Sequence, residues 1–594
     1  MRTPLVLVLF LVAACTTTSN SRFGDGGGLD GGAVGDSGPS FGDEGGLPGG
    51  GYCSGDLRSI LDSQGNVVET CANDQGCAGG KCIAACDAAG ASKGSIGCNF
   101  RVTTPPLYYG TSSGLVGQGC FAVFVANAWS RDAKISLSRQ GQSFDATKFG
   151  RIAGSGSPQA WATVPSNGVP PGKVAVLFLS HQANSKGPLG DSMACPVAPA
   201  YAASTTPLDA SGTLATAKSY GFLIESDTPV TSYDIMPFGG ASSYTPSAQL
   251  LLPTTAWGTN FVAAIAPVTN NGYAMYGTNQ WMHVLASADG TEVSVAPTQS
   301  LPGGVGFPAG AKNSVTKYTL NAGDFIQWQN VGDVTGTVLN SNKPIAVMGG
   351  NALFAWSTKT SLLGDCCAEA THQSSPPVTA LGSEYAPSPI RTRSGVAESI
   401  GYRIVGAVDG TKLTYDPPIS GAPASLSVGS SGIFETTSAF TVKSQDNAHP
   451  FFLAQIISGG ATENLGDPEY VNVLPPAQFL SQYIFFTDPT YTDTHLALVR
   501  VKGAKGFEDV EVGCAGKVTG WKSVGTGGTY EYATLALTSS GSGVGSCANG
   551  PQSAKSKAPF GVVVWGFSQA ASYGYPAGGN AAGINQVFVE PVPR

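Results

Sequence analysis

The chain has 594 residues, of which 42% are hydrophobic and only 12% are charged, and its formal net charge is −8. An average domain carries about 25% charged residues. The 31 Lys and Arg residues are too few and too scattered to form a basic surface for a phosphate backbone, so the composition argues against a nucleic-acid partner. The hydrophobic content suffices for large cores, and we expect about three to five domains or one repeat array.

The chain begins with the pattern of a bacterial lipoprotein signal peptide. Arg2 gives a short basic region, residues 4–11 are apolar, and small residues precede Cys15. We predict a signal peptide over residues 1–14 and a lipid on Cys15; the alternative is an ordinary secretory signal with a chance cysteine. Thr16, rather than an aspartate, follows Cys15, and by resemblance to known lipoproteins this favours the outer membrane. The expected location is the outer membrane or cell surface of a Gram-negative bacterium.

The segment after the signal peptide has no capacity to form a core. Residues 15–51 contain 14 glycines among Ser, Thr, Asp and Pro. Such a composition has too little apolar surface to order the chain, and it predicts a flexible tether. No later stretch reaches the roughly 18 apolar residues of a membrane span. The lipid is therefore the expected contact with the membrane.

Twelve of the thirteen cysteines follow Cys15, an even number in a compartment where disulfides persist. Residues 52–98 contain six of them but no histidine and no Cys-x-x-Cys pair, which favours disulfides over zinc and predicts a disulfide-rich module. The connectivity within the module stays open. The disulfide candidates of the whole chain are Cys53, Cys71, Cys77, Cys82, Cys86, Cys98, Cys120 with Cys195, and Cys514 with Cys547. The adjacent Cys366 and Cys367 could bridge each other only with strain.

Residues 99–594 repeat themselves. A proline that leads into an apolar strand recurs at Pro229, Pro344, Pro450 and Pro559, so the spacings are 115, 106 and 109 residues. A second motif between the units begins at Pro253, Pro377 and Pro475 and continues with a large apolar residue at +4 and an aromatic residue at +8. We therefore predict four repeated units of about 110 residues.

Within each unit the apolar residues alternate with a period of two. Asp289-Gly290 and Asp409-Gly410 stand between alternating runs, a pattern that predicts β-hairpin turns and gives these aspartates a structural role. The second unit contains seven strand candidates and no helical period. The predicted fold is all-β. A propeller, which would leave few exposed sheet edges, is slightly favoured over tandem β-sandwiches.

Several stretches resemble the IgGFc-binding protein N-terminal domain family. They are GDCCAEATHQSSPPVTALGSEY (364–385), NSNKPIAVMGGN (340–351) and VDGTKLTY (408–415). The stretch GDPEYVNVLPPAQFLSQYIFFTDPTY (466–491), together with the cysteine-rich lead, resembles the bacterial members, which are often lipoproteins. The resemblance covers most of residues 100–594 and implies an extracellular binding or adhesion module without catalysis. It supplies no residue set for binding antibody Fc.

The residues that usually carry chemistry form no motif. The five histidines, His181, His283, His372, His449 and His495, have no metal-ligand spacing, and no phosphate loop follows a strand. We predict no catalytic residue, no metal and no cofactor. His372 beside Cys366 and Cys367 could form a nucleophile pair, but an oxidising compartment favours disulfides.

The expected function is recognition or adhesion, with an extracellular glycoconjugate or protein as the partner. The ligand-binding residues are unknown; Trp129, Phe354, Trp356 and Tyr491 are candidates for exposed aromatic platforms. One alternative is a polysaccharide hydrolase or lyase, for which two carboxylates must converge, one with a raised pKa. The candidates are Asp324, Asp365, Glu369, Asp467 and Glu469. The other alternative is a structural component of the envelope.

Overall fold

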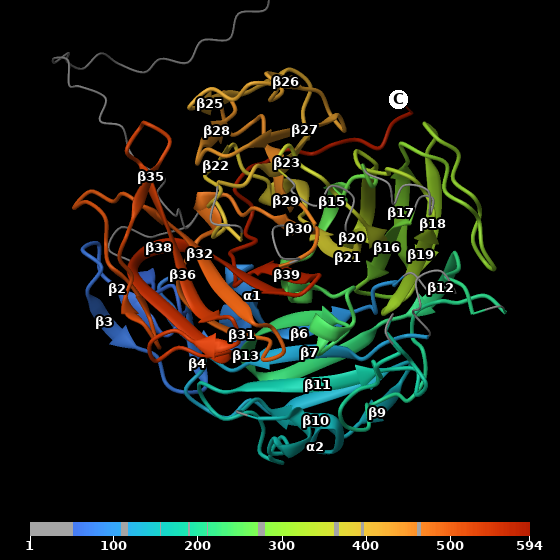
Figure 1. Ribbon diagram of the computed structural model, residues 1–594, viewed down its shortest axis with the longest axis horizontal. Coiled ribbons are helices and arrows are strands. Elements are labelled where there is room, and N and C mark those ends of the chain that lie inside the picture. The colour runs from blue at the N-terminus through green and yellow to red at the C-terminus, as the bar shows by residue number, and fades with distance from the viewer. Residues whose placement is uncertain are drawn as a thin grey trace, which may run out of the picture. The chain divides into compact units, whose positions relative to one another are not determined.

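The computed structural model describes residues 51–107, 117–154, 156–187, 190–210, 212–270, 279–360, 367–393, 397–459 and 465–593. These residues form an all-β protein, as predicted, whose sheets curl into half-barrels (Figure 1). The predicted signal peptide, Cys15 and the tether up to residue 50 lie outside the described residues, as do Asp365 and Cys366. Within the described ranges, no helix is long and apolar enough to span a membrane.

Disulfides hold together the small N-terminal module. Cys53 is bonded to Cys77, Cys71 to Cys82, and Cys86 to Cys98. The only residues in the small core are Ile60 and the neighbouring cysteines, so covalent bonds replace the packing that a larger domain would have. The elements are β1 (Tyr52–Cys53), β2 (Ser59–Leu61), β3 (Val67–Thr70), β4 (Gln75–Ala78), β5 (Lys81–Ala84) and α1 (Ala85–Ser92).

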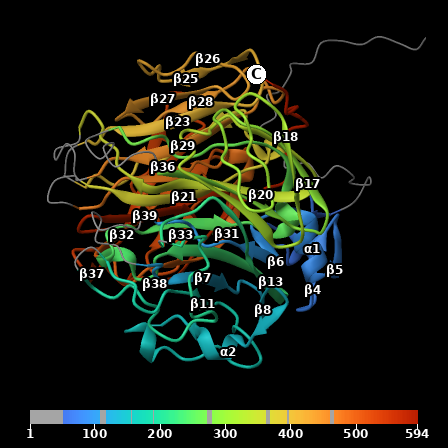
Figure 2. The ribbon, with the colours of Figure 1, turned by 90° about the vertical axis from the view of Figure 1, so that its right-hand side faces the viewer.

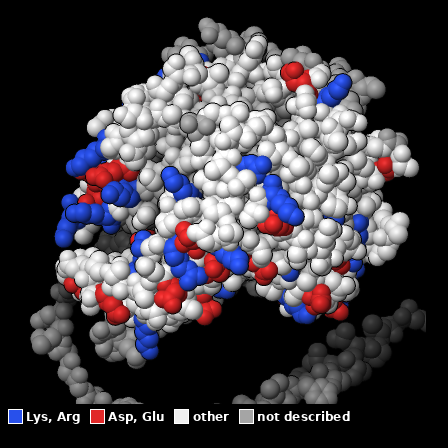
Figure 3. Space-filling model, turned by 90° about the horizontal axis from the view of Figure 1, so that it is seen from below, with Lys and Arg blue, Asp and Glu red and all other residues white. Residues whose placement is uncertain are grey.

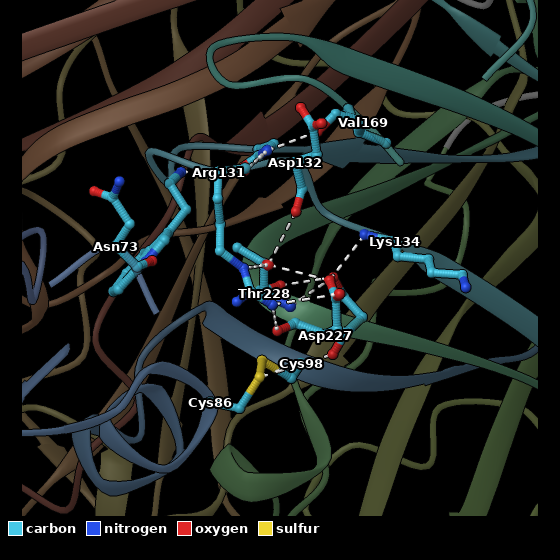
Figure 4. Close-up of polar contacts among 12 residues, drawn as sticks. Asn73, Cys86, Cys98, Arg131, Asp132, Lys134, Val169, Asp227 and Thr228 are labelled. Atoms are coloured by element: carbon cyan, nitrogen blue, oxygen red, sulfur yellow. Dashed lines mark hydrogen bonds and ion pairs between the residues drawn. A yellow bond between two sulfur atoms is a disulfide. The ribbon is translucent and has the colours of Figure 1, made fainter. Parts of the chain in front are cut away.

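The module packs against the first large sheet (Figures 2 and 4). Helix α1 contacts β6 (Ile96–Val102) and β13 (Phe222–Met236). The indole N–H of Trp129 donates a hydrogen bond to the carbonyl oxygen of Asn73 at 3.0 Å. Beside it, the Arg131 guanidinium donates to Thr228 Oγ1 at 2.8 Å and pairs with Asp227 at 3.3 Å. Asn73 of the module is thus bonded to Trp129, and its side chain also accepts a hydrogen bond from Ser130 at 2.9 Å, while the Arg131 contacts hold the facing segment of the sheet region in place.

The first sheet has eight antiparallel strands around β13. The order is β10-β11-β7-β13-β8-β9, with β6 and β14 also paired to β13. Cys120 and Cys195 form a disulfide beside β7 and β11. The remaining elements are β7 (Phe121–Ala126), β8 (Ile135–Arg139), β9 (Gln142–Phe144), α2 (Ala146–Phe149), β10 (Gly150–Ile152), β11 (Val174–Ser180) and β14 (Ser247–Leu251).

The second sheet has the same strand order around β20 as the first sheet has around β13, except that its edge strand β12 comes from the segment before β13. The order is β12-β19-β16-β20-β17-β18, with β15 and β21 also paired to β20. Its strands are β12 (Ala217–Tyr220), β15 (Gly258–Val262), β16 (Gln280–Ala286), β17 (Thr291–Ala296), β18 (Thr316–Leu320), β19 (Asp324–Gln329), β20 (Val338–Phe354) and β21 (Glu369–Ser375).

The next group of strands is divided into smaller sheets. Their orders are β27-β23-β29-β30, β22-β28-β25 and β24-β26. The strands are β22 (Glu384–Tyr385), β23 (Ile400–Gly406), β24 (Thr411–Lys412), β25 (Thr414–Asp416), β26 (Ser425–Leu426), β27 (Ser431–Thr436), β28 (Thr441–Lys443), β29 (Phe451–Ile457) and β30 (Glu469–Asn472).

The last sheet has nine strands around β38. The order is β34-β33-β38-β32-β36-β35, with β31 and β39 paired to β38 and β37 to β36. Cys514 and Cys547 form a disulfide in it. The strands are β31 (Leu480–Thr487), β32 (Asp493–Val501), β33 (Val510–Val512), β34 (Gly516–Lys517), β35 (Lys522–Val524), β36 (Tyr530–Ser539), β37 (Ser542–Gly543), β38 (Gly550–Ser568) and β39 (Ala571–Pro576).

The proline of the first sequence motif lies where a long strand changes partners. In β20, residues before Pro344 pair with β17 and with most of β15, and residues after it pair with β16 and β21. Pro559 has the same position in β38. A proline has no N–H to donate, so it suits the position at which a strand bends from one layer into the next.

The propeller expected from the strand count is not found. Its blades would have four strands each. The three largest sheets in the described residues have eight, eight and nine strands. Because each long strand crosses between layers, each sheet curls around its own core, which contains Val123 and Leu177 in the first sheet and Trp328 in the second.

Strands β14, β21, β30 and β39 contact one another in a closed circuit, which we call the central ring (Figure 1). One strand comes from each of the four groups described above. The second sequence motif also lies at contacts between these groups: a Cβ atom placed on Gly258 would lie 2.4 Å from Pro377 Cβ, and one on Gly382 would lie 2.5 Å from Pro475 Cβ. Glycine is favoured there because the ring of the packed proline occupies the space that a side chain would need.

The segment after β39 ties distant parts of the body together. Its Gly579 carbonyl accepts a hydrogen bond from the Ser95 N–H at 2.7 Å. Further along, the Asn585 side-chain amide donates to the carbonyl of Val378, and the Val589 N–H donates to Asn260 at 2.8 Å. The chain end is thereby part of the packed body.

Candidate functional site

A cleft of about 590 Å³ lies where residues of the first and second sheets meet, and we call it the polar cleft. Its lining comes from the ends of strands and the turns that follow them. The lining contains four charged residues, although only 12% of the chain is charged. On the face in Figure 3, positive and negative side chains are mixed. The lining residues are Arg101, Ser138, Arg139, Gln140, Gly141, Lys218, Tyr220, Gly221, Leu223, Asn321, Ala322, Gly323 and Asp324.

Local strand geometry positions these side chains. Arg139 ends β8, and a tight turn follows in which Gln140 and Gly141 have φ values of 51° and 75°. On the other side, β12 pairs with β19, so that Tyr220 lies opposite Asp324. The cleft is therefore bounded by hydrogen-bonded backbone on both sides and is preformed.

The Arg139 guanidinium is held in place without a carboxylate. Its Cζ atom lies 5.0 Å from the centre of the Tyr201 ring and 5.7 Å from that of Phe222. It donates to the carbonyl oxygen of Tyr220 at 3.3 Å and to Gln140 Oε1 at 3.2 Å. Partial burial lowers the pKa of Arg139, but an arginine stays charged at neutral pH.

Arg101 also lacks an ion-pair partner among the described residues. Its Nε atom is buried, and no described atom accepts a hydrogen bond from it. Partial burial lowers the pKa of Arg101, while the more distant Glu225 and Asp289 oppose that shift. Two guanidiniums with unused donors therefore line one cleft.

The other charges of the cleft are paired. Lys218 Nζ lies 2.8 Å from Asp324 Oδ2, and the carboxylate is almost fully buried. Tyr220 is 41% exposed and presents an aromatic ring at the rim. Charge, hydrogen-bonding groups and an aromatic face are the elements of a binding site for a polar ligand.

Three carboxyls that the sequence analysis proposed for an enzyme meet at one end of the central ring. Glu369, Asp467 and Glu469 have 0% exposure, and we call them the acidic cluster. Glu369 Oε1 accepts from the Ser572 N–H at 2.8 Å, and Glu469 Oε1 accepts from the Tyr470 N–H at 2.8 Å. Among the described residues, the second oxygen of each glutamate and both carboxylate oxygens of Asp467 have no hydrogen-bond partner.

Burial raises the pKa of all three carboxyls well above their usual values. For Glu369, the neighbouring Asp467 and Glu469 raise it further. The nearby Arg393 opposes the shift of Glu369 and Asp467, but it also pairs with Glu398 at 2.9 Å. Burial therefore favours the neutral, protonated form of these carboxyls. A glycosidase pair must contact a sugar, and none of the three has a surface on which a sugar could lie.

His372 belongs to the same interior. Its Nε2 lies 2.6 Å from Asp234 Oδ1, and Gln249 donates to Asp234 Oδ2 at 2.9 Å. The neighbouring Cys367 is disulfide-bonded, so it offers no thiol to His372. The Cys–His nucleophile considered for this stretch is absent from the described residues.

The aromatic platforms proposed from the sequence are wrong. Exposure is 2% for Trp129, 0% for Phe354, 6% for Trp356 and 2% for Tyr491. They pack into the module interface and the cores, where burial of large rings stabilises the fold. The exposed aromatic residues of the described chain are Tyr52, Tyr220 and Phe588, none of which was proposed from the sequence, and of these Tyr220 lines the polar cleft.

The other predicted site residues are distributed as follows. Asp324 lies in the polar cleft, whereas His283 and His495 are buried and His449 pairs with Asp446 on the surface at 2.7 Å. The described residues contain no group of His, Cys, Asp or Glu that could hold a metal ion. Ten of the cysteines form the five disulfides described above.

Curled antiparallel sheets with an open polar cleft and an inaccessible acidic cluster define an all-β binding module. More particularly, the chain belongs to the IgGFc binding protein family, whose model matches residues 247–566. This is a family of binding domains and not of enzymes. None of the curated proteins compared with the chain matches it. The match begins at β14, so Arg101, Arg139, Lys218 and Tyr220 of the polar cleft lie outside it.

The sequence analysis missed Arg101, Arg139 and Tyr220. No local motif joins them, because they come from β6, β8 and β12. The available signal was the scarcity of charge: an arginine next to a Gln-Gly turn at the end of an alternating strand is unusual in a chain with 12% charged residues.

Proposed function

We propose that this protein is a non-catalytic module for extracellular binding and adhesion, with a glycoconjugate or a protein as the ligand. Membership of the IgGFc binding protein family supports a binding role. The observation that carries the proposal is the preformed polar cleft, which has two guanidiniums free of carboxylates. The acidic cluster is buried, so the hydrolase or lyase alternative lacks an accessible pair of acids.

We further propose that the body consists of four units derived from one repeat. The shared strand order around β13, β20 and β38 supports this, as does the contribution of one strand from each group to the central ring. Repeated units present several loops on one rigid scaffold, which suits a ligand with repeated features.

The location is proposed from the sequence. A lipid on Cys15 would hold the body at the outer membrane or cell surface through the tether. Metabolic labelling with a fatty-acid analogue tests this: the wild-type chain takes up label and Cys15→Ser does not. Equal labelling of the two would refute lipidation at this residue.

A binding screen of the full chain in detergent micelles tests the function. The panel contains glycan arrays, mucins, immunoglobulin Fc and intact cells, and the supernatant is checked for released sugar. Saturable binding without product is the expected result. Release of product would favour an enzyme, and no binding to any member would favour a structural role in the envelope.

A further inference from the structure

We propose that the polar cleft binds an acidic polysaccharide, whose carboxylate or sulfate groups are contacted by Arg101 and Arg139. This inference rests on the proposed function and names its site and ligand class. Guanidinium groups recognise both kinds of anion through paired N–H donors, so the two share one chemistry.

The two guanidiniums of the polar cleft have no carboxylate partner among the described residues. In the described part of the chain, Arg131, Arg393, Arg403 and Arg500 each pair with a carboxylate within 4.0 Å, whereas Arg58, Arg101, Arg139, Arg151 and Arg391 do not. Of these five, Arg101 and Arg139 line the polar cleft. Both are partly buried, and burial without a counter-charge is unfavourable. A bound anion would supply the missing counter-charge.

The net charge of the lining is positive. Arg101, Arg139 and Lys218 are cationic, and Asp324 is the only acidic residue in the lining. Glu225 and Asp289 act on Arg101 from outside the lining, and Asp324 is already paired with Lys218. The cleft therefore favours anions although the whole chain has a net charge of −8.

These donors are held in position before a ligand arrives. Arg139 is fixed between the rings of Tyr201 and Phe222, and a Cβ atom placed on Gly323 would lie 3.0 Å from Arg101 Nη1. The guanidinium of Arg101 thus lies directly against a backbone that has no side chain. Fixed donors lose little conformational entropy on binding.

The remaining lining favours a sugar over a peptide. Ser138, Gln140 and Asn321 offer hydroxyl and amide groups to sugar hydroxyls, and Tyr220 offers an exposed ring face. Leu223 is the only large aliphatic side chain in the lining, so the anchoring pockets that peptide side chains need are missing from it.

The test measures affinity of the full chain in detergent micelles by calorimetry at fixed ionic strength. The probes are polygalacturonate for carboxylate, dextran sulfate for sulfate, neutral dextran, and poly-glutamate as an acidic peptide. The variants are Arg101→Gln, Arg139→Gln and the double variant. Arg391→Gln is the control, because it removes the same charge from an exposed residue that does not line the cleft.

We expect at least one acidic polysaccharide to bind and neutral dextran not to bind. Each cleft variant should weaken binding about tenfold, as expected for loss of a hydrogen bond to a charged group, and the control by less than about twofold. Arg139→Lys keeps the charge but loses the planar pair of N–H donors. Its affinity for the polysaccharide should lie between those of wild type and Arg139→Gln. Thermal unfolding midpoints within about 2 °C of wild type would show that the variants are folded.

Three results would overturn the inference. The first is equal weakening by the control, the second is equal binding of neutral dextran, and the third is tighter binding of poly-glutamate than of either polysaccharide. If the chain binds another member of the wider panel and the cleft variants leave that binding unchanged, the inference fails and the proposed binding function stands. If nothing binds, both fail.

Discussion

Replacing Glu369 by Gln in the acidic cluster should change how stability depends on pH. Burial raises the pKa of Glu369, Asp467 and Glu469 in the folded state, so the folded protein binds more protons than the unfolded chain at neutral pH. The contribution of these three carboxyls to the free energy of unfolding therefore falls as pH rises above about 4, the pKa of these groups in the unfolded chain, until each group reaches its folded pKa. This contribution is complete below the unfolded-state pKa of about 4 and is lost as pH rises toward the folded-state pKa.

The size of the effect follows from the number of protons. Each carboxyl that stays protonated in the folded state changes the free energy of unfolding by about 1.4 kcal/mol per pH unit. Three such carboxyls give about 4 kcal/mol per pH unit. For a body of this size, that corresponds to a fall in the unfolding midpoint of about 3 °C per pH unit. A neutral amide at position 369 removes about a third of the slope.

The assay is thermal unfolding of wild type and Glu369→Gln at half-unit steps between about pH 5 and pH 7.5, a window above the unfolded-state pKa of a carboxyl. Asp509→Asn is the control, because Asp509 is fully exposed and its hydrogen bond and ion pair with Lys517 lower its pKa. The unfolding midpoint of Glu369→Gln should fall less with pH than that of wild type, and the midpoint of Asp509→Asn should change with pH as that of wild type does. Below about pH 6.5 the buried His283 and His495, whose pKa values are lowered to about 3, give wild type and variant the same opposing contribution, so the difference between the two slopes is the readout. A variant with the wild-type slope would refute the raised pKa of Glu369.

Three further predictions concern stability. Asp333→Asn removes the partner of Arg403, whose side chain is 1% exposed, and should lower the free energy of unfolding by about 3 kcal/mol. Arg403→Met should lower it by less, because Asp333 is 33% exposed and keeps contact with water. Denaturant titration of both variants measures the two losses, and the reverse order would contradict the prediction. Gly258→Ala would place a methyl group 2.4 Å from Pro377 and should destabilise by about 1–3 kcal/mol, whereas Gly503→Ala, whose nearest neighbour atom would be 3.6 Å away, should be within about 0.5 kcal/mol of wild type in the same titration. Removing the Cys120–Cys195 disulfide, which spans 75 residues, should cost about 4 kcal/mol, against about 3 kcal/mol for Cys71–Cys82, which spans 11; equal losses in chemical denaturation would show that loop length does not set the difference.

Repetition in the sequence predicted the parts of the fold that depend on short-range chemistry. The prolines at 229, 344 and 559 mark the bends of β13, β20 and β38, and the Asp-Gly pair at 289–290 forms the turn before β17. Such features are readable because one residue type determines the local backbone. The arrangement of the sheets was not readable in this way. Both a propeller and a set of curled sheets satisfy the same alternation, and the contacts that distinguish them join strands that are distant in the sequence, such as β14 and β39.

The same limit explains the errors at the candidate site. Glu369, Asp467 and Glu469 were candidates for an accessible pair of acids, but the closure of the central ring buries them. Charged residues are rarely buried, so their sequence carried no sign of this. Trp129 and Tyr491 were proposed as platforms because they stand near expected loop ends, but the module and the last sheet cover them. Burial is a property of the assembled sheets and not of the local pattern.

The buried and half-buried arginines of the described chain fall into two groups, those whose charge is satisfied within the fold and those that have no carboxylate partner. Arg403 is buried, but Asp333 and the Ile265 carbonyl satisfy its guanidinium, so its role is complete within the fold. Arg101 and Arg139 are partly buried without a carboxylate, an arrangement that weakens the folded state and that neutral residues could avoid. Functional sites are the places where a fold retains such locally unfavourable groups. If the cleft serves a ligand, Arg101→Gln should leave stability unchanged or raise it while it weakens binding, because the buried Nε of Arg101 has no partner among the described residues. A purely structural role for Arg101 would not produce this combination.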